Sequence, residues 1–450
     1  MAIGLLSPVG QRVPRKITLL SLIAATYFIV AGGPFGLEDI VSKAGYAGAL
    51  LILLVTPLLW ALPTVLMVSE LASTLPQDGG YYIWASRSMG RFWGFQEAWL
   101  SIVGGIFDIG IYPTLFVEYV GHFAPSVTAG GRGIWIKVGL IAACALWNLL
   151  GAARVGGSSV WMGVFLLAPF VLLTGYAFTH RVAQAGAPIP LHNVDFLGGI
   201  LVAMWNYMSW DQASTVAGEV ERPQRTYPLA MAAAILLVTL SYLLPVGAVA
   251  LTGLDPNRWS TGGWADVARA VVQHPLLAEV LAVGITIGGM IGAVGTLNAQ
   301  VMTFSRLPAV LAEDRFLPIV LARRLSRTGA PWVAIAACSV VWALSLGMSF
   351  TKLVLLDVLL TGLSVLLEFA SLVALRIREP ELPRPYRVPG GFLVASLLGV
   401  PSLVLLVLAA VRNYAEPVGP MNALEFGGIL IVLGVVAYFL GDQTRKHDHR

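Results

Sequence analysis

Twelve apolar stretches follow one another along this chain of 450 residues, and each is long enough for a helix to cross a lipid bilayer. Hydrophobic residues make up 57% of the sequence and charged residues only 12%, a balance that a soluble globular domain does not show. We therefore predict an all-α integral membrane protein with twelve transmembrane helices. The predicted spans are 17–42, 46–74, 93–123, 134–152, 157–179, 197–218, 228–252, 276–311, 332–350, 353–377, 391–411 and 424–441.

Lysine and arginine residues gather on one side of this predicted bundle. The termini and the even-numbered connections carry 20 of the 28, and the opposite connections carry 8. Basic residues favour the cytoplasmic side of a membrane protein. We expect a multi-pass protein of the cell (cytoplasmic) membrane with both termini in the cytoplasm. The net charge of +4 then follows from topology and requires no nucleic acid as a partner.

The first span is interrupted in its middle by three glycines and a proline. Glycine weakens helical structure, and Pro34 lacks the N–H that would continue the hydrogen-bond ladder. Unpaired backbone groups are tolerated inside a membrane only where they face protein, water or a ligand, as in the substrate sites of carriers. A glycine packing kink is the alternative. The candidate substrate-facing residues are Ala31, Gly32, Gly33, Pro34, Phe35 and Gly36.

The sixth span is interrupted too, because polar residues fall between Trp205 and Ser214 in what should be membrane interior. Matching breaks indicate that helices 1–5 and 6–10 are two repeats, and an odd number of spans in each gives them opposite orientations. We expect a five-plus-five inverted repeat with helices 11 and 12 outside it. The corresponding domains are an N-terminal tail (1–16), two repeats (17–180 and 181–378), helices 11 and 12 (379–442) and a C-terminal tail (443–450).

Two carboxylates inside predicted spans favour a positively charged ligand. Asp108 lies in the third span, where a charge costs about 2.5 to 3.5 kcal/mol on insertion scales, and Tyr112 follows one helical turn later. Asp211 lies in the interrupted sixth span, among aromatic residues of the kind that enclose organic cations. These aromatic residues are Trp205, Tyr207 and Trp210. An aspartate that only bonds a neighbouring helix, and tryptophans that only pack, are the alternatives.

Glu368 in helix 10 is a third intramembrane carboxylate. It is either a proton carrier or one half of a structural pair with an arginine such as Arg376. Asp108, Asp211 and Glu368 are therefore the candidate proton-coupling residues, whereas Glu118 and Asp357 lie nearer the ends of spans, where water reaches them. An inner gate of salt bridges is expected after helix 6, from Glu219, Glu221, Arg222 and Arg225.

The histidines and cysteines do not form the patterns of a metal site or a hydrolase. The six histidines fall in loops, at span ends or in the tail, and the two cysteines lie far apart inside spans. We therefore expect no enzyme activity, no metal and no cofactor. A membrane enzyme and a sensor without transport are the remote alternatives.

Five motifs in order resemble the amino acid, polyamine and organocation (APC) transporter superfamily. Gly32 to Asp39 in helix 1 is similar to the GGPxGxED pattern of its polyamine-uptake branch, which includes L-type amino-acid transporter-like proteins. The other motifs are Gly79-Gly80-Tyr81 with Phe92 to Gln96, Asp108 to Tyr119, Ala217 to Pro223, and PELPRPYRVP at 380–389. The resemblance implies a leucine-transporter-type fold and a permease that works by alternating access.

The resemblance implies secondary active transport of amino acids, polyamines or related organic cations, with a proton as the coupling ion. A neutral amino-acid permease or exchanger is the alternative. The resemblance also implies a gating aromatic at Trp205 and an acidic or polar ligand at Asp211. In helix 8, some polyamine carriers have acidic residues where this chain has Asn298 and Gln300, and Asn298 joins the candidate substrate ligands. The helix 5 lysine that mimics sodium in some members is replaced here by Gly163.

Overall fold

The computed structural model describes residues 16–128, 131–180, 195–260 and 262–448, and this part of the chain is mostly helical. Eight of its helices are long and apolar enough to cross a membrane. Shorter apolar helices accompany them at Leu19–Val30, Gly133–Asn148 and Trp332–Ser345. The structure therefore confirms a helical protein with several membrane-spanning segments, whereas the number of twelve spans stays a prediction.

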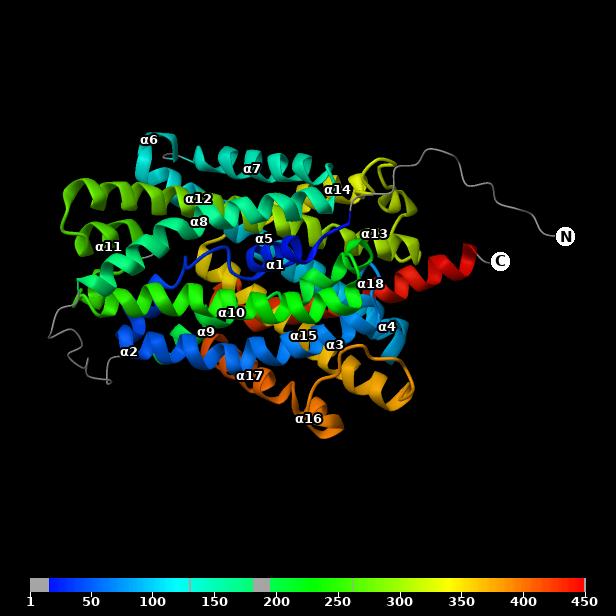
Figure 1. Cartoon of the computed structure of the whole chain (residues 1–450). Coiled ribbons are helices and arrows are strands. Elements are labelled where there is room, and N and C mark those ends of the chain that lie inside the picture. The colour runs from blue at the N-terminus through cyan, green and yellow to red at the C-terminus, as the bar shows by residue number, and fades with distance from the viewer. Residues whose placement is uncertain (1–15, 129–130, 181–194, 261, 449–450) are drawn as a thin grey trace.

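The helices form one bundle in which the long ones run side by side (Figure 1). The first part of the chain forms α1 (Leu19–Val30), α2 (Glu38–Thr56), the π-helical turn η1 (Pro57–Ala61), α3 (Leu62–Thr74), α4 (Tyr81–Met89), α5 (Arg91–Phe123), α6 (Pro125–Thr128), α7 (Gly133–Asn148) and α8 (Ala152–Thr179). The middle part forms α9 (Phe196–Asn206), the 3-10 turns η3 (Asp211–Thr215) and η4 (Ala217–Glu219), α10 (Pro223–Ala250), η5 (Pro256–Arg258), α11 (Trp264–Val271) and α12 (Pro275–Phe304).

The last part of the chain forms α13 (Arg306–Glu313), η6 (Ile319–Ala322), α14 (Trp332–Trp342), η7 (Ala343–Ser345), α15 (Phe350–Arg378), α16 (Gly391–Leu397), α17 (Val400–Asn413) and α18 (Ala423–Asp448). A short antiparallel hairpin of β1 (Pro417–Val418) and β2 (Met421–Asn422) precedes α18. In Figure 1, α11 lies at one end of the bundle, and α4, α13 and the end of α18 lie at the other.

The break in the first predicted span lies where the sequence places it. α1 ends at Val30, residues 31–37 are not helical, and α2 begins at Glu38. Gly45 then interrupts α2 with a positive φ of 62°, and this kink separates the first predicted span from the second. Both changes of direction fall at glycines, the residues that adopt a positive φ without steric cost.

The sixth predicted span is also interrupted. α9 ends at Asn206, residues 207–210 form no helix, and Ser209 has a positive φ of 70°. The chain continues in the 3-10 turns η3 and η4 instead of a second α-helical segment. The predicted break is therefore confirmed, and the half that follows it is less regular than expected.

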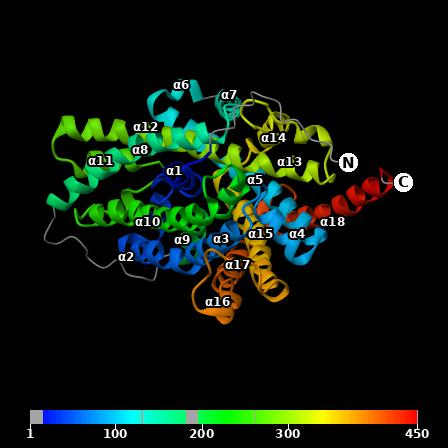
Figure 2. The same cartoon turned by 45° about the vertical axis from the view of Figure 1, so that its right-hand side comes forward.

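The helix α5 lies at the centre of the bundle, packed against α4, α12 and α15. The short helix α1 packs against α8, α10 and α12, and it lies between them in both views (Figure 2). Four buried carboxylates lie on α5 and α15, namely Glu97, Asp108, Asp357 and Glu368. The two broken segments meet this pair of helices, and the candidate site forms there.

Candidate substrate-binding site

The broken backbone of helix 1 packs directly against α12. Gly32, Gly33 and Gly36 have φ angles of 59°, 108° and 84°. A Cβ at Gly32 would lie only 2.3 Å from Oγ1 of Thr296, so the two helices approach each other as closely as a glycine allows. The indole N–H of Trp264, at the start of α11, donates to the Pro34 carbonyl at 2.7 Å. Contacts with α12 and with α11 thus hold the helix 1 break on two sides.

Replacing Gly32 with alanine is expected to abolish transport. Alanine in the left-handed region costs about 1–2 kcal/mol, and its Cβ would push Thr296 away from the break. Uptake into proteoliposomes measures the effect. The matched control is Gly157→Ala in α8, where a Cβ meets no atom within 4 Å and transport should persist. Equal uptake by the two variants would show that transport does not require the close contact between Gly32 and Thr296.

Asp108 is fully buried in the middle of α5 and accepts two hydrogen bonds. The Tyr112 hydroxyl donates to its Oδ1 at 2.6 Å, which confirms the expected neighbour one turn away. Nε2 of Gln300 donates to its Oδ2 at 2.7 Å and also to the Ile29 carbonyl, at 3.1 Å. Gln300 therefore joins α12, the end of α1 and the carboxylate, a connection that the sequence did not reveal.

Trp205 closes the other side of this carboxylate. Its indole lies beside Asp108 and would be 3.1 Å from a Cβ at Gly36, so it contacts both α5 and the helix 1 break. The ring of Phe350, at the start of α15, meets the indole edge-on at 5.5 Å between centroids. Gly36, Asp108 and Trp205 are thus brought together as the sequence predicts, and Phe350 adds an aromatic surface that was missed.

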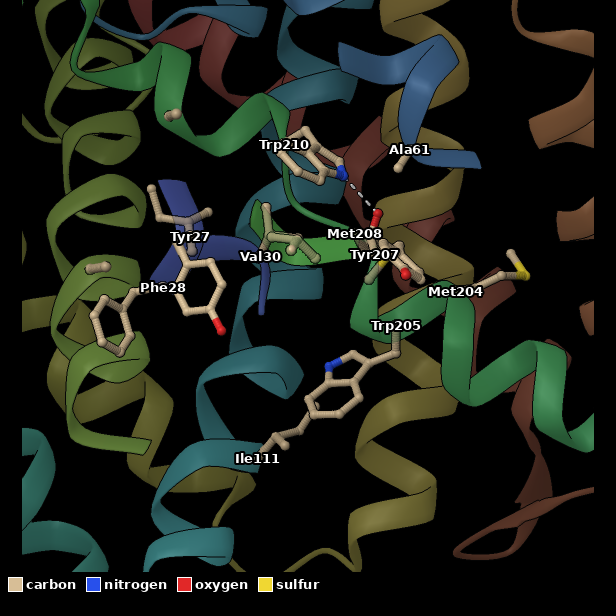
Figure 3. Close-up of a cluster of buried hydrophobic side chains, with 14 of the residues drawn as sticks. Tyr27, Phe28, Val30, Ala61, Ile111, Met204, Trp205, Tyr207, Met208 and Trp210 are labelled. Carbon is tan, nitrogen blue, oxygen red and sulfur yellow. Dashed lines mark hydrogen bonds between the residues drawn. The ribbon is translucent and has the colours of Figure 1, made fainter. Parts of the chain in front are cut away.

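The three aromatic residues that the sequence places near Asp211 do not all point in one direction. Tyr207 donates its hydroxyl to the Leu53 carbonyl at 3.0 Å, and the Trp210 indole donates to the Tyr207 carbonyl at 2.8 Å. Figure 3 shows Trp205 beside Ile111 of α5, with Trp210 on the opposite side of Tyr207. Because the chain leaves the helix after Asn206, consecutive aromatic residues point in different directions. The polar groups of Tyr207 and Trp210 therefore bond to backbone carbonyls and hold the break, whereas Trp205 lies beside Asp108.

Two other candidate ligands face elsewhere. Oδ1 of Asn298 accepts from the Asn148 amide at 2.8 Å, so this side chain joins α12 to α7 instead of facing Asp108. Phe35 packs edge-on between Tyr119 and Phe170, with both centroid distances at 5.3 Å. Of the two polar residues that stand where some polyamine carriers have acids, Gln300 bonds to Asp108 and Asn298 bonds to Asn148.

The expected alternative of a Glu368–Arg376 pair is wrong. Arg376 instead holds the buried carboxylate of Glu70, with its Nε at 3.0 Å and its Nη2 at 2.5 Å. The carboxyl of Glu368 faces Asp211. Asp357 was expected near water, yet it is buried and accepts from Thr361 at 2.8 Å. The carboxylates of α15 therefore face the protein interior, toward α5 and η3.

One of the four residues predicted for an inner gate forms an ion pair. Glu219 pairs with Arg306 at 3.0 Å, and this guanidinium is completely buried. Glu221, Arg222 and Arg225 are exposed and form no ion pair within the described part of the chain. The chain turns at Arg222, whose φ is 44°, so these side chains leave the interior.

Asp78, in the connection between α3 and α4, adds further polar contacts beside the Glu219–Arg306 pair. Its Oδ1 accepts from the backbone N–H of Gly218 at 3.0 Å, and its Oδ2 meets Arg324 at 3.5 Å. Burial and the nearby Glu219 raise the pKa of Asp78, and Arg324 opposes this shift. These contacts thus connect the start of α4, the end of the broken helix 6 and the segment after α13.

A bundle of apolar helices with two broken segments meeting at a buried carboxylate is the construction of a membrane carrier. The amino acid permease family model matches residues 18–436, and the chain belongs to this family. It is 34% identical to the polyamine transporter PUT1 of Oryza sativa subsp. japonica, over 92% of this chain and 78% of that protein. It is 33% identical to the polyamine transporter RMV1 of Arabidopsis thaliana, over 92% and 84%.

A more distant relative has another named activity. The serine/threonine exchanger SteT of Bacillus subtilis (strain 168) is 25% identical over 72% of this chain and 74% of that protein. The family and these relatives identify the chain as a transporter of the permease class, and not an enzyme.

Proposed function

We propose that this protein is a secondary active transporter that carries organic amines, polyamines in the first place and amino acids otherwise, across the cell membrane. The observation that carries the proposal is Asp108, buried beside Trp205 and the helix 1 break and without a basic partner among the described residues. A buried carboxylate next to an aromatic ring favours an ammonium group. The relatives named polyamine transporters support the same class of substrate.

The proposed architecture is a leucine-transporter-type fold with twelve spans, two inverted repeats over 17–180 and 181–378, and helices 11 and 12 outside them. The interruptions of helix 1 and helix 6 support this arrangement. Arginines near the ends of α4 and α13 lie at one end of the bundle, which supports a cytoplasmic position for that end and for both termini. The Glu219–Arg306 pair would then close the cytoplasmic side, and transport would require it to open.

Proton coupling is the proposed source of energy. Asp108, Asp211 and Glu368 are buried carboxyl groups that can bind either a proton or a positively charged substrate. Competition between the two at one carboxylate links substrate movement to the proton gradient. A transporter that couples to protons in this way needs no sodium gradient.

A neutral amino-acid permease or exchanger is the second candidate. The helix 1 break presents backbone groups that can hold a carboxylate, and Asp108 can hold the α-ammonium group of the same molecule. The relative named a serine/threonine exchanger favours this alternative.

Competition in proteoliposomes distinguishes the two candidates. We expect putrescine and spermidine to inhibit uptake of a radiolabelled amine and to be accumulated themselves when a pH gradient is imposed. Serine and threonine should inhibit weakly, because they carry a single ammonium group beside a carboxylate. Displacement by serine or threonine without any effect of putrescine or spermidine would favour the exchanger.

A further inference from the structure

A second group of carboxylates lies where α5, α15 and η3 meet, nearer than Asp108 to the end of the bundle that carries α4 and α13. Its members are Glu97, Asp211 and Glu368, and each is completely buried. Asp211 interacts electrostatically with Glu97, and its carboxyl faces that of Glu368. We call these three residues the inner carboxylates. Glu97 was not expected from the sequence.

Only some of the oxygens of the inner carboxylates accept a hydrogen bond from a protein donor. Ser364 donates to Oε1 of Glu97 at 2.6 Å, whereas Oε2 of Glu97 and both oxygens of Glu368 receive no N–H or hydroxyl donor among the described residues. The buried amide Nε2 of Gln212, next to Asp211 in the chain, also has no partner there. Its Oε1 accepts from the Tyr81 hydroxyl at 3.3 Å. Buried polar atoms without partners are rare in proteins, and each requires an explanation such as a bound water, an ion or a functional role.

The two buried arginines of the described residues already pair with other acids. Arg376 holds Glu70, and Arg306 holds Glu219. No lysine or arginine of the described residues forms an ion pair with the inner carboxylates. Three buried acids that interact electrostatically inside a membrane are costly unless a cation or protons neutralise them.

The inner carboxylates and Asp108 lie on one continuous strip. Ser364 contacts Glu97, and a Cβ at Gly104 would lie 2.6 Å from Thr361, so α5 and α15 run antiparallel here. Glu97 and Asp108 are separated by eleven residues, as are Asp357 and Glu368. At about 1.5 Å per helical residue, the two ends of the strip are roughly 16 Å apart. Asp211 interacts electrostatically with the acids at both ends, which places it between them.

We propose that Glu97, Asp211 and Glu368 form a second ammonium-binding site, which holds the far amine of a linear polyamine while Asp108 holds the near one. This inference rests on the proposed function and specifies its substrate class. Long, flexible molecules with ammonium groups separated by methylene chains fit a strip of separated carboxylates. An α-amino acid carries both charges on neighbouring atoms and occupies only one end.

The first test uses the wild-type protein in proteoliposomes and a series of competitors of increasing length. Inhibition constants should fall at least tenfold from putrescine to spermidine, because only the longer molecule reaches both sites. Equal constants for the two amines would overturn the second site while leaving amine transport standing. Failure of every amine to compete would instead overturn the proposed function.

The second test uses Glu97→Gln and Glu368→Gln, which preserve side-chain shape and remove the charge. Each should weaken spermidine at least tenfold and putrescine less than threefold, and Glu118→Gln, at an exposed position of α5, should change neither. Equal weakening of both amines, or of neither, would overturn the proposal. Loss of proton-driven accumulation with an unchanged ratio of the two constants would assign the inner carboxylates to protons alone and overturn it as well. If neither variant folds, the wild-type series decides.

Discussion

Replacing Asp108 with asparagine should weaken a cationic substrate by about 1.5 to 3 kcal/mol, the contribution of a hydrogen bond to a charged group. This corresponds to an increase of roughly ten- to more than a hundredfold in the dissociation constant. The amide keeps an oxygen that can accept from Tyr112 or Gln300, so the local packing should survive. The loss therefore reports the missing negative charge. Concentration-dependent uptake and equilibrium binding of spermidine measure it.

The same helix supplies the control for Asp108. Glu118 lies ten residues further along α5 at an exposed position, and Glu118→Gln should leave both uptake and binding unchanged. Size-exclusion profiles establish that both variants are folded. A folded Asp108→Asn variant with wild-type affinity would remove this carboxylate from the substrate site and favour a purely structural bond to α12.

The helix breaks could be predicted because their causes are local. Glycine and proline disturb a helix wherever they occur, and neither Gly32 nor Pro34 depends on a distant partner for this effect. The contact between Asp108 and Tyr112 is local as well, since residues four apart share a helical face. Features with local causes can therefore be predicted from a short stretch of sequence.

The partners of the buried charges could not be predicted in the same way. Glu368 and Arg376 lie eight residues apart on α15, yet one faces Asp211 and the other faces Glu70 of α3. Which face of α15 meets which helix is set by packing across the whole bundle. The same reason explains why Asn298 faces α7 while Gln300, two residues away, reaches Asp108.

Among the buried carboxylates that form ion pairs, Glu70 has the largest set of polar partners. It pairs with Arg376 at 2.5 Å and with Arg384 at 3.3 Å, and it accepts the backbone N–H of Val388 at 2.7 Å. Arg384 and Val388 both belong to the PELPRPYRVP segment after α15. This motif therefore fastens the chain between α15 and α16 onto the end of α3.

Glu70→Gln should accordingly cause the largest loss of stability among single carboxylate changes. Removing one partner of a buried ion pair costs about 3–5 kcal/mol, because the remaining charge stays buried without compensation. Here Arg376 would lose its counter-charge and Arg384 its nearest acid. Thermal unfolding of the detergent-solubilised protein, followed by size exclusion, measures the loss. Glu379→Gln, which breaks an exposed pair with Arg87, should cost at most about 1 kcal/mol.

A double variant separates charge compensation from simple packing. Glu70→Met with Arg376→Met removes both buried charges and fills their space with flexible apolar side chains, so it should be more stable than Glu70→Gln alone. Arg384 still donates to the carbonyls of Leu375 and Glu379 at 3.0 Å each, and it keeps these partners in the double variant. A double variant as unstable as the single one would show that the hydrogen bonds of Glu70 and Arg376 to the backbone of Val388 and Gly391, and not the ion pair, hold the segment in place.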